Sequence, residues 1–346
     1  MRACVVHGAG DLRIEDRATP EPGPGEITVA VAYGGICGSD LHYYHRGSVG
    51  DFHVREPMVL GHEVAGTVAA SDVAGLAAGT PVAIHPATPC NDCRECAQGR
   101  RNVCARTRYL GSAAHLPHVQ GGFAQQLVVP AEQVRALPAG LDLRRAVLAE
   151  PLSVALHAVR RAGDVAGKRV LVTGAGPIGC LVVAALRSAG AAEVISSDLL
   201  DEPLAIAAAV GATTAVRADT PASAWPGDVD VAIEASGSAG GLATCIQQLR
   251  RGGTIVLLGL LPPGDTGFPG NVVVTREITM VGAFRFDREF DEALTLLGAG
   301  LVVDPIISHT FALSEARVAF AVAGDRRVAS KVLLDLTDGT VMDSDR

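Results

Sequence analysis

The stretch that decides the fold is Val170–Gly179, which reads VLVTGAGPIG. Its apolar, β-branched start predicts a short buried strand, and the Gly-x-Gly-x-x-Gly turn that follows leads into an apolar helix. In such a turn Gly174 permits the tight bend, Gly176 lets a pyrophosphate approach the backbone, and Gly179 lets the helix pack closely on the strand. Because the free N–H groups at the helix start attract phosphate, this stretch predicts a dinucleotide-binding site.

An acidic residue stands where a dinucleotide site needs one. Asp198 follows the next predicted strand and lies 22 positions after Gly176. A carboxylate there can accept hydrogen bonds from the adenosine ribose, and it repels a 2′-phosphate. Residues 199–204 contain no Arg or Lys, so we expect NAD rather than NADP as the cofactor. The alternative interpretation of Asp198 is the N-cap of the following helix.

The sequence around this stretch alternates between strand and helix patterns. Helices are predicted at 178–189 and 204–210. Strands are predicted at 170–173, 194–197, 229–234, 254–258 and 278–281. This βαβ alternation indicates an α/β fold with a parallel, doubly wound sheet.

The first 150 residues have a different texture, with many glycines and short strand-like runs. Turn signals such as PGPG at 22–25 separate these runs. Strands are predicted at 27–33, 64–69, 81–85 and 124–129. This part of the chain is therefore expected to form an irregular, β-rich domain.

The end of the chain is expected to return to this first domain. Helices are predicted at 287–297 and 315–322, and a closing strand at 331–336. The expected division is a β-rich domain of residues 1–153 and 287–346, and a nucleotide-binding domain of residues 154–286.

Composition limits the classes of function. The 346 residues carry 29 Lys and Arg against 37 Asp and Glu, a net charge of −8, and 48% of them are hydrophobic. So much apolar material excludes a disordered chain, and the acidic balance argues against nucleic-acid binding. The start of the chain lacks a signal-peptide pattern, and there is no run of about 18 uncharged apolar residues. We therefore expect a cytoplasmic protein without membrane contact.

Four cysteines cluster within one short segment. They are Cys90, Cys93, Cys96 and Cys104, with the spacing C-x2-C-x2-C-x7-C. Four thiolates at such spacing are typical of a closed, tetrahedral zinc site with a structural role. An iron–sulfur cluster also uses four thiolates, and disulfides are the third interpretation, which a cytoplasmic location disfavours.

Three separated stretches supply a second set of metal-binding side chains. The set is Cys37, His62, Glu63 and Glu150, within GICGSDLHY at 35–43, GHE at 61–63 and AEPL at 149–152. Zinc accepts sulfur, nitrogen and oxygen ligands, and catalytic zinc keeps one position open for water or substrate. Each residue alone has a structural interpretation, such as a packed cysteine or a core histidine. Their occurrence together with the nucleotide motif and the cysteine cluster favours an open zinc site.

These motifs, in this order, resemble the zinc-dependent medium-chain dehydrogenase/reductase family almost end to end. Within the family, the polyol and sugar-acid branch is most similar. Its markers are CGSDLHY at 37–43, PMVLGHE at 57–63 and EPLSVALHA at 150–158. The resemblance implies a GroES-like catalytic domain joined to a Rossmann domain, with catalytic and structural Zn²⁺, NAD, and a homodimer or homotetramer.

The resemblance also implies roles for individual residues. Cys37 and His62 would bind the catalytic zinc, and the carboxylates of Glu63 and Glu150 would complete its shell directly or through water. Glu150 stands where alcohol dehydrogenases of the family have a second cysteine. The proton relay would be Ser39 and His42, with Tyr43 in the substrate pocket. The implied cofactor contacts are Gly174, Gly176, Pro177, Ile178, Gly179, Asp198, Gly259, Leu260, Phe284 and Arg285.

The implied reaction is oxidation of a secondary alcohol of a polyol or sugar acid, with hydride transfer to the nicotinamide. A sugar acid needs a cationic partner. The candidates are Arg285, Arg108, His118 and Arg46, of which Arg285 is best placed because it follows the strand expected to flank the nicotinamide. Two alternatives remain open: a neutral-polyol dehydrogenase of the sorbitol or xylitol type, and a non-catalytic NAD-binding protein on the same scaffold.

Overall fold

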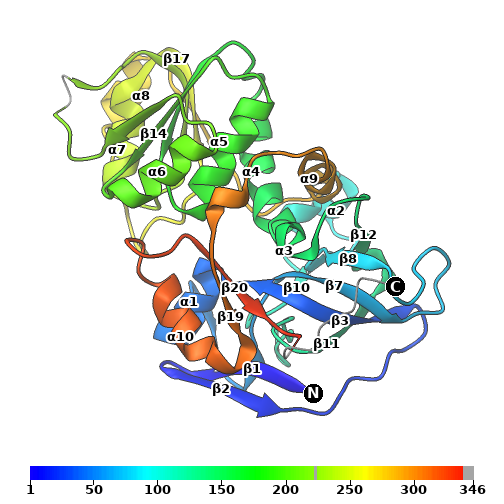
Figure 1. Cartoon of the computed structure of the whole chain (residues 1–346). Helices are drawn as coiled ribbons and strands as arrows, with labels where there is room; N and C mark the ends of the chain where they lie inside the picture. The colour runs from blue at the N-terminus through cyan, green and yellow to red at the C-terminus, as the bar shows by residue number, and fades with distance from the viewer. Residues whose placement is uncertain (222–223, 338–346) are drawn as a thin grey trace.

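Two large sheets organise the chain, of which the computed structural model describes residues 1–221 and 224–337. Every neighbouring strand pair of the upper sheet in Figure 1 is parallel. Its strands lie in the order β15-β14-β13-β16-β17-β18, so the chain order reverses between β13 and β16, as in a doubly wound sheet. The bounds are β13 Arg169–Thr173, β14 Glu193–Asp198, β15 Thr214–Arg217, β16 Val229–Glu234, β17 Leu249–Leu257 and β18 Thr279–Gly282.

This sheet confirms the predicted α/β class. All five strands predicted for it are present, and β16 has the predicted bounds. The strand β15 was not predicted, because none of its residues is buried and no apolar run marks it. The helices packed on the sheet are α5 (Pro177–Ser188), α6 (Asp201–Ala209) and α7 (Ala239–Gln248). The helix α7 was also missed, since two glycines near its start weaken the helical pattern.

The lower part of Figure 1 holds a seven-stranded sheet with strands from both ends of the chain. Its order is β12-β8-β7-β3-β20-β19, and β11 also pairs with β3. The strand β20 runs antiparallel to β3, with Leu333 opposite Gly35. The bounds are β3 Glu26–Gly35, β7 Glu63–Ala70, β8 Pro81–Ile84, β11 Gln126–Pro130, β12 Val134–Ala136, β19 Ile307–Ala312 and β20 Lys331–Asp335. A smaller sheet contains β1 (Arg2–Gly8), β2 (Asp11–Asp16) and β6 (Met58–Val59).

The register of the large β-sheet brings distant segments to one point. The pairing of β3 with β7 places Gly35 opposite Glu63, and β20 lies on the other side of β3. A Cβ atom at Gly35 would come within 2.2 Å of Glu63 Oε2, so glycine is needed beside this carboxylate. The end of β3 and the starts of β7 and β20 therefore meet.

Two helices lie between the sheets, as Figure 1 shows. They are α4 (Ala149–Arg161) and α9 (Glu289–Gly298), which pack on each other. The helix α4 also packs on α5, and its first turn carries Glu150. Buried apolar side chains of these three helices and of the parallel sheet form one continuous core. Within the described ranges, no helix combines the length and apolar character needed to cross a membrane.

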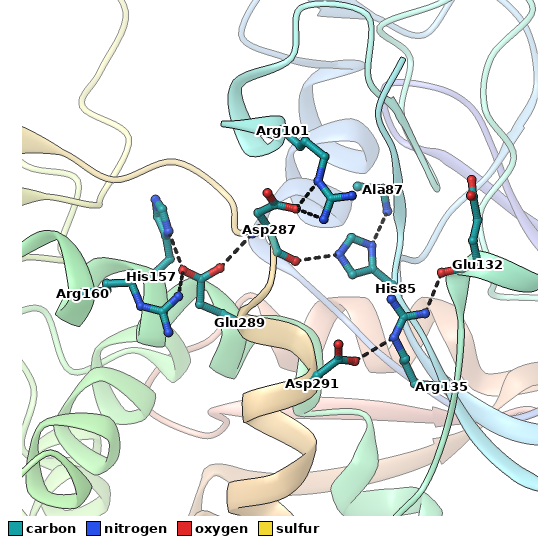
Figure 2. A network of polar contacts seen from close by, with 10 residues as sticks. All are labelled: His85, Ala87, Arg101, Glu132, Arg135, His157, Arg160, Asp287, Glu289 and Asp291. Carbon is teal, nitrogen blue, oxygen red and sulfur yellow. Dashed lines mark hydrogen bonds and ion pairs between the residues drawn. The ribbon is translucent and has the colours of Figure 1, made fainter. Parts of the chain in front are cut away.

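A polar network fixes the segment that leads into α9 (Figure 2). The Asp287 carboxylate accepts a hydrogen bond from Arg101 Nε at 2.8 Å, and its carbonyl oxygen lies 3.3 Å from His85 Nε2. The neighbouring Asn102 side chain donates to the Phe284 carbonyl at 2.9 Å. Since Arg101 and Asn102 lie between the third and fourth cysteines of the cluster, the cysteine segment is tied directly to residues 284–287.

The second half of this network surrounds the buried Glu289 carboxylate. Glu289 Oε1 lies 2.8 Å from Arg160 Nη1 and 3.0 Å from His157 Nδ1, while Oε2 accepts the Asp287 N–H at 2.9 Å. Burial alone would raise the pKa of Glu289, but the hydrogen bonds from His157 and the Asp287 N–H lower it from 4.5 to about 2. The folded state therefore favours the ionised form of this carboxyl group.

We expect Glu289→Gln to lower the free energy of unfolding at neutral pH and to lower it less at acidic pH. Because the folded pKa lies below the unfolded pKa, the stabilisation is complete above pH 4.5 and is lost as the pH falls towards 2. Denaturant unfolding should show a loss of about 1–3 kcal/mol at pH 7, shrinking below pH 4.5. A difference between variant and parent that is constant from pH 7 to pH 3 would contradict this account.

Candidate metal centres and nucleotide cleft

The four clustered cysteines lie between β9 (Ala87–Thr88) and β10 (Arg108–Tyr109), in a segment that contains the short helix α2 (Arg94–Ala97). Their Sγ atoms are 3.9 Å apart for Cys90–Cys96, 3.8 Å for Cys93–Cys104 and 3.4 Å for Cys90–Cys104. Sulfur atoms around a tetrahedral zinc at Zn–S distances of about 2.3 Å lie about 3.8 Å apart. All four thiols are free. The spacing leaves room for a single ion rather than a multi-atom cluster, so the residues fit structural zinc.

A second group of ligand atoms forms where β3, β7 and β20 meet. Cys37, His62 and Glu63 supply these atoms, and we call them the open metal group. Cys37 is the N-cap of α1 (Gly38–Arg46), directly after β3, and His62 and Glu63 lead into β7. The ligand atoms of these three residues all lie within 4.8 Å of one another. His62 is 6% exposed and Glu63 is fully buried. A thiolate, an imidazole and a carboxylate at such separations fit the three protein ligands of an open zinc site.

The fourth predicted ligand, Glu150, lies beside this group and is hydrogen-bonded to a tyrosine. Its Oε1 atom accepts a hydrogen bond from the Tyr109 hydroxyl at 2.6 Å, and the Tyr109 ring lies 5.7 Å from the His62 ring. Burial, reinforced by the Glu150 charge, raises the pKa of Tyr109 well above its ordinary value, so the hydroxyl keeps its proton. Tyr109 therefore fixes one oxygen of Glu150, a role that was not predicted from the sequence.

A buried lysine, also missed, holds the Glu63 carboxylate. Lys331 Nζ lies 2.8 and 2.7 Å from the two Glu63 oxygens and donates to the Ile36 carbonyl at 3.0 Å. Burial alone would lower the pKa of this ammonium group, but the Glu63 carboxylate raises it above its ordinary value. The available signal was a lysine directly before three apolar residues of β20, because a charged group beside a buried apolar run needs a partner.

Asp40 connects the two stretches that supply Cys37 and His62. Its side chain is fully buried, and it accepts the Cys37 N–H at 2.9 Å and the Gly61 N–H at 3.2 Å. Gly61 has a φ of +96°, and a Cβ there would come within 2.1 Å of Phe123. Asp40 thereby fixes the backbone on either side of the metal-binding group.

The predicted relay residues lie on α1. Ser39 and His42 are three positions apart, so they share one face of the helix. His42 is exposed, whereas Tyr43 is buried and its hydroxyl accepts the Ala113 N–H at 3.1 Å. Partial burial, together with Arg46, lowers the pKa of His42. The relay and the substrate contact of Tyr43 stay predictions.

Two of the four cationic candidates for substrate binding, Arg285 and His118, lie in different places. The Arg285 guanidinium stacks over the Tyr109 ring, 4.5 Å from its centre, and its backbone has a φ of +53°, which is costly for a residue with a side chain. His118 lines another cavity of about 530 Å³. Its ring nitrogens contact the Arg55 N–H at 2.9 Å and the His115 carbonyl at 2.7 Å. Arg285 is thus adjacent to the open metal group through Tyr109, whereas the structure does not bring His118 to it.

A cavity of about 330 Å³ runs from the open metal group to the glycine-rich turn. Cys37, Glu63 and Lys331 line it together with Gly176 to Gly179 and Arg326. The helix α5 has Gly176 as its N-cap and Pro177 in its first turn. A Cβ at Gly176 would meet nothing within 4 Å, whereas one at Gly179 would come within 1.8 Å of the Gly174 carbonyl oxygen. The turn is therefore tightly packed at Gly179 and open at Gly176, at the N-terminus of α5. This open space fits a bound pyrophosphate.

The predicted contacts on the nicotinamide side border a neighbouring cavity. Gly259, Leu260 and Phe284 line a space of about 830 Å³ between the cysteine segment, α4 and the ends of β17 and β18. At the other end of the nucleotide turn, Asp198 accepts the Ala175 N–H at 2.8 Å and the Leu200 N–H at 3.2 Å. Leu200 is the N-cap residue of α6, so Asp198 does not have that role.

Two family models match this chain. "Alcohol dehydrogenase GroES-like domain" matches residues 23–139, and "Zinc-binding dehydrogenase" matches residues 177–299. Among curated proteins, the chain is 38% identical to L-idonate 5-dehydrogenase (NAD(P)(+)) of Escherichia coli K12, covering 96% of this chain and 98% of that one. It is 37% identical to sorbitol dehydrogenase of Gallus gallus, covering 92% of each.

Solved structures show the same relationship. The crystal structure of the Escherichia coli L-idonate 5-dehydrogenase superimposes with a TM-score of 0.92, covering 96% of this chain and 97% of that one at 38% identity. An alcohol dehydrogenase from E. coli CFT073 complexed with NADH gives a TM-score of 0.88 at 29% identity, covering 97% and 99%. This chain belongs to the zinc-containing medium-chain dehydrogenase/reductase family. It is a zinc-binding, NAD(P)-dependent dehydrogenase.

Proposed function

We propose that this chain oxidises a secondary alcohol of a sugar acid or polyol, and that its substrate is L-idonate, with 5-dehydro-D-gluconate as the product. The observation that carries the proposal is the single cavity that joins Cys37 and Glu63 to the glycine-rich turn. Relatives named for L-idonate and sorbitol support this substrate class. The stretches YY at 43–44, GSA at 111–113, PHV at 117–119, GGF at 121–123 and GAFRF at 282–286 resemble L-idonate 5-dehydrogenases.

The side chains around the cavity account for the steps of such an oxidation. When bound, zinc would lower the pKa of the substrate hydroxyl, and the nicotinamide would accept the hydride. Cys37 and His62 would hold the metal, with carboxylate oxygens available from Glu63 and Glu150. Ser39 and His42 would carry the hydroxyl proton away to solvent, and the lowered pKa of His42 leaves a neutral imidazole that can accept a proton near pH 7.

Turnover of a small substrate panel tests this function. The expected result is NAD(P) reduction with L-idonate at a higher kcat/KM than with sorbitol or xylitol. Higher kcat/KM with the neutral polyols would favour the alternative, a sorbitol- or xylitol-type dehydrogenase, which the identity to sorbitol dehydrogenase also supports. A chain that binds NAD but carries one zinc or none, and turns over no substrate, would be the non-catalytic scaffold. We further propose a cytoplasmic homodimer or homotetramer.

We expect Arg285→Ala to lower kcat/KM for the sugar acid far more than kcat/KM for a neutral polyol. Its guanidinium, held over Tyr109, is available to pair with the substrate carboxylate, and losing such a charge-assisted pair costs about 1.5–3 kcal/mol. Steady-state kinetics should therefore show kcat/KM for L-idonate falling by at least about tenfold more than kcat/KM for sorbitol. Arg108→Ala is the matched control, because Arg108 is exposed on β10 and lines the other cavity, together with His118. Equal losses for both substrates would count against carboxylate recognition by Arg285.

A further inference from the structure

The adenosine end of the nucleotide cavity is capped by an arginine that the sequence places far away. Arg326 lies in the segment 324–330, between α10 (Ala316–Ala323) and β20. In Figure 1 this segment is the red loop that rises towards the six-stranded sheet. The Arg326 Nη2 group donates a hydrogen bond to Asp198 Oδ2. An ion pair therefore connects the C-terminal part of the chain to the end of β14.

The two partners of this pair differ in accessibility. The Asp198 side chain is 3% exposed, whereas that of Arg326 is 49% exposed, and Arg326 lines the nucleotide cavity. A ligand that arrives at this end therefore meets a cation before it meets the carboxylate. A guanidinium has five N–H donors, and in the described part of the chain the contact with Asp198 is the one that Arg326 makes. Its other donors remain available to a ligand.

A second arginine near the same strand end is already occupied. Arg217 lies opposite Asp198 in the pairing of β14 with β15. Its guanidinium is 2.9 Å from the Asp219 carboxylate and 3.3 Å from that of Asp201. Two carboxylates neutralise this cation, so it offers little to a further anion. Among the arginines that the structure describes on β15 and in the segment 324–330, Arg326 is the one that both lines the cavity and contacts Asp198.

We propose that Arg326 is the specificity-determining residue at this end of the cavity, because it would bind the 2′-phosphate that distinguishes NADP from NAD. An uncovered Asp198 would repel a 2′-phosphate, as the sequence analysis assumed, but Arg326 compensates this charge and can bind phosphate oxygens through its free donors. For NAD, Asp198 Oδ1, whose contact in the described part of the chain is the Leu200 N–H, can still accept a hydrogen bond from a ribose hydroxyl. The inference rests on the proposed function, because it takes the cavity to be the cofactor site.

Binding measurements on the full zinc-loaded chain test this proposal without relying on turnover. NADH and NADPH are titrated by nicotinamide fluorescence, and 5′-AMP and 2′,5′-ADP by calorimetry. The unaltered chain should bind NADPH within about tenfold of NADH. In Arg326→Ala, NADPH and 2′,5′-ADP should bind at least about tenfold more weakly, the loss of one charge-assisted pair. NADH and 5′-AMP should change by less than about threefold, which also shows that the variant is folded.

Two further variants sharpen the test. Arg326→Lys should keep part of the NADPH affinity, since the charge stays while the fork of donors is lost. Arg217→Ala is the matched control and should leave the ratio of NADPH to NADH affinity unchanged. The proposal is overturned if Arg326→Ala weakens both nucleotides equally, if Arg217→Ala removes NADPH binding, or if the unaltered chain rejects 2′,5′-ADP. If the chain binds neither dinucleotide, the proposed function is overturned together with this inference. If it binds both but oxidises no polyol or sugar acid, the proposed function alone is overturned.

Discussion

Replacing Cys37 with serine should abolish turnover and leave nucleotide binding intact. Cys37 supplies the thiolate of the open metal group, and a neutral hydroxyl is a much weaker zinc ligand. The metal supplies several kcal/mol of charge stabilisation in the transition state, so kcat/KM should fall by at least about 1000-fold. The glycine-rich turn and Asp198 lie at the other end of the cavity and are unaltered, so NADH should bind as before. Steady-state kinetics and fluorescence titration measure the two quantities.

Metal content and a matched cysteine separate this explanation from a general loss of structure. Zinc should fall from about two ions per chain to about one, because the four-cysteine cluster is untouched. Cys245→Ser changes a buried thiol in α7, outside both metal-binding groups, and should keep activity and zinc content. If Cys37→Ser retained near-normal turnover, the zinc mechanism would be wrong.

Replacing Lys331 with methionine should lower the free energy of unfolding more than Glu289→Gln does. The ammonium group contacts both oxygens of the fully buried Glu63, so methionine fills most of the space but leaves a buried carboxylate without its counter-charge. Removing one partner of a buried pair costs about 3–5 kcal/mol. This is a large share of the free energy of unfolding of a typical protein, which is about 5–15 kcal/mol. Denaturant unfolding at pH 7 should show this loss.

The double variant Glu63→Gln with Lys331→Met is the control for this cause. With the charge of Glu63 also removed, at least half of the lost stability should return, because the cost lies in the unpaired carboxylate rather than in the missing lysine. A double variant as unstable as Lys331→Met alone would show that the lysine stabilises the fold by packing and not by pairing with Glu63.

Local patterns account for the part of the molecule that the sequence predicts well. The strand β13, its glycine turn and α5 follow one another in the chain, so apolar periodicity and turn chemistry are sufficient to find them. The four-cysteine cluster is likewise local, since all four ligands lie within the segment 90–104. The placement of Cys37 next to His62 was predicted from the resemblance rather than from spacing, and the register of β3 and β7 explains it.

Contacts between distant segments could not be predicted from the sequence. Lys331 reaches Glu63 only because β20 enters the sheet beside β3, and Arg326 reaches Asp198 only because the loop before β20 rises towards β14. No periodicity encodes such pairings, because the first depends on the order of the strands in the β-rich sheet and the second on how that part of the chain faces the parallel sheet. The expectation of an uncovered Asp198 therefore missed Arg326, since it considered only the neighbouring residues 199–204.

The position of β20 also determines the order in which the molecule can be completed during synthesis. All six strands of the parallel sheet lie between residues 169 and 282, so they leave the ribosome before β20 does. The β-rich sheet begins with β3 but has an open place between β3 and β19 until residues 331–335 emerge. The domain that is started first is thus finished last, and until then the edge of β3 stays available to other chains.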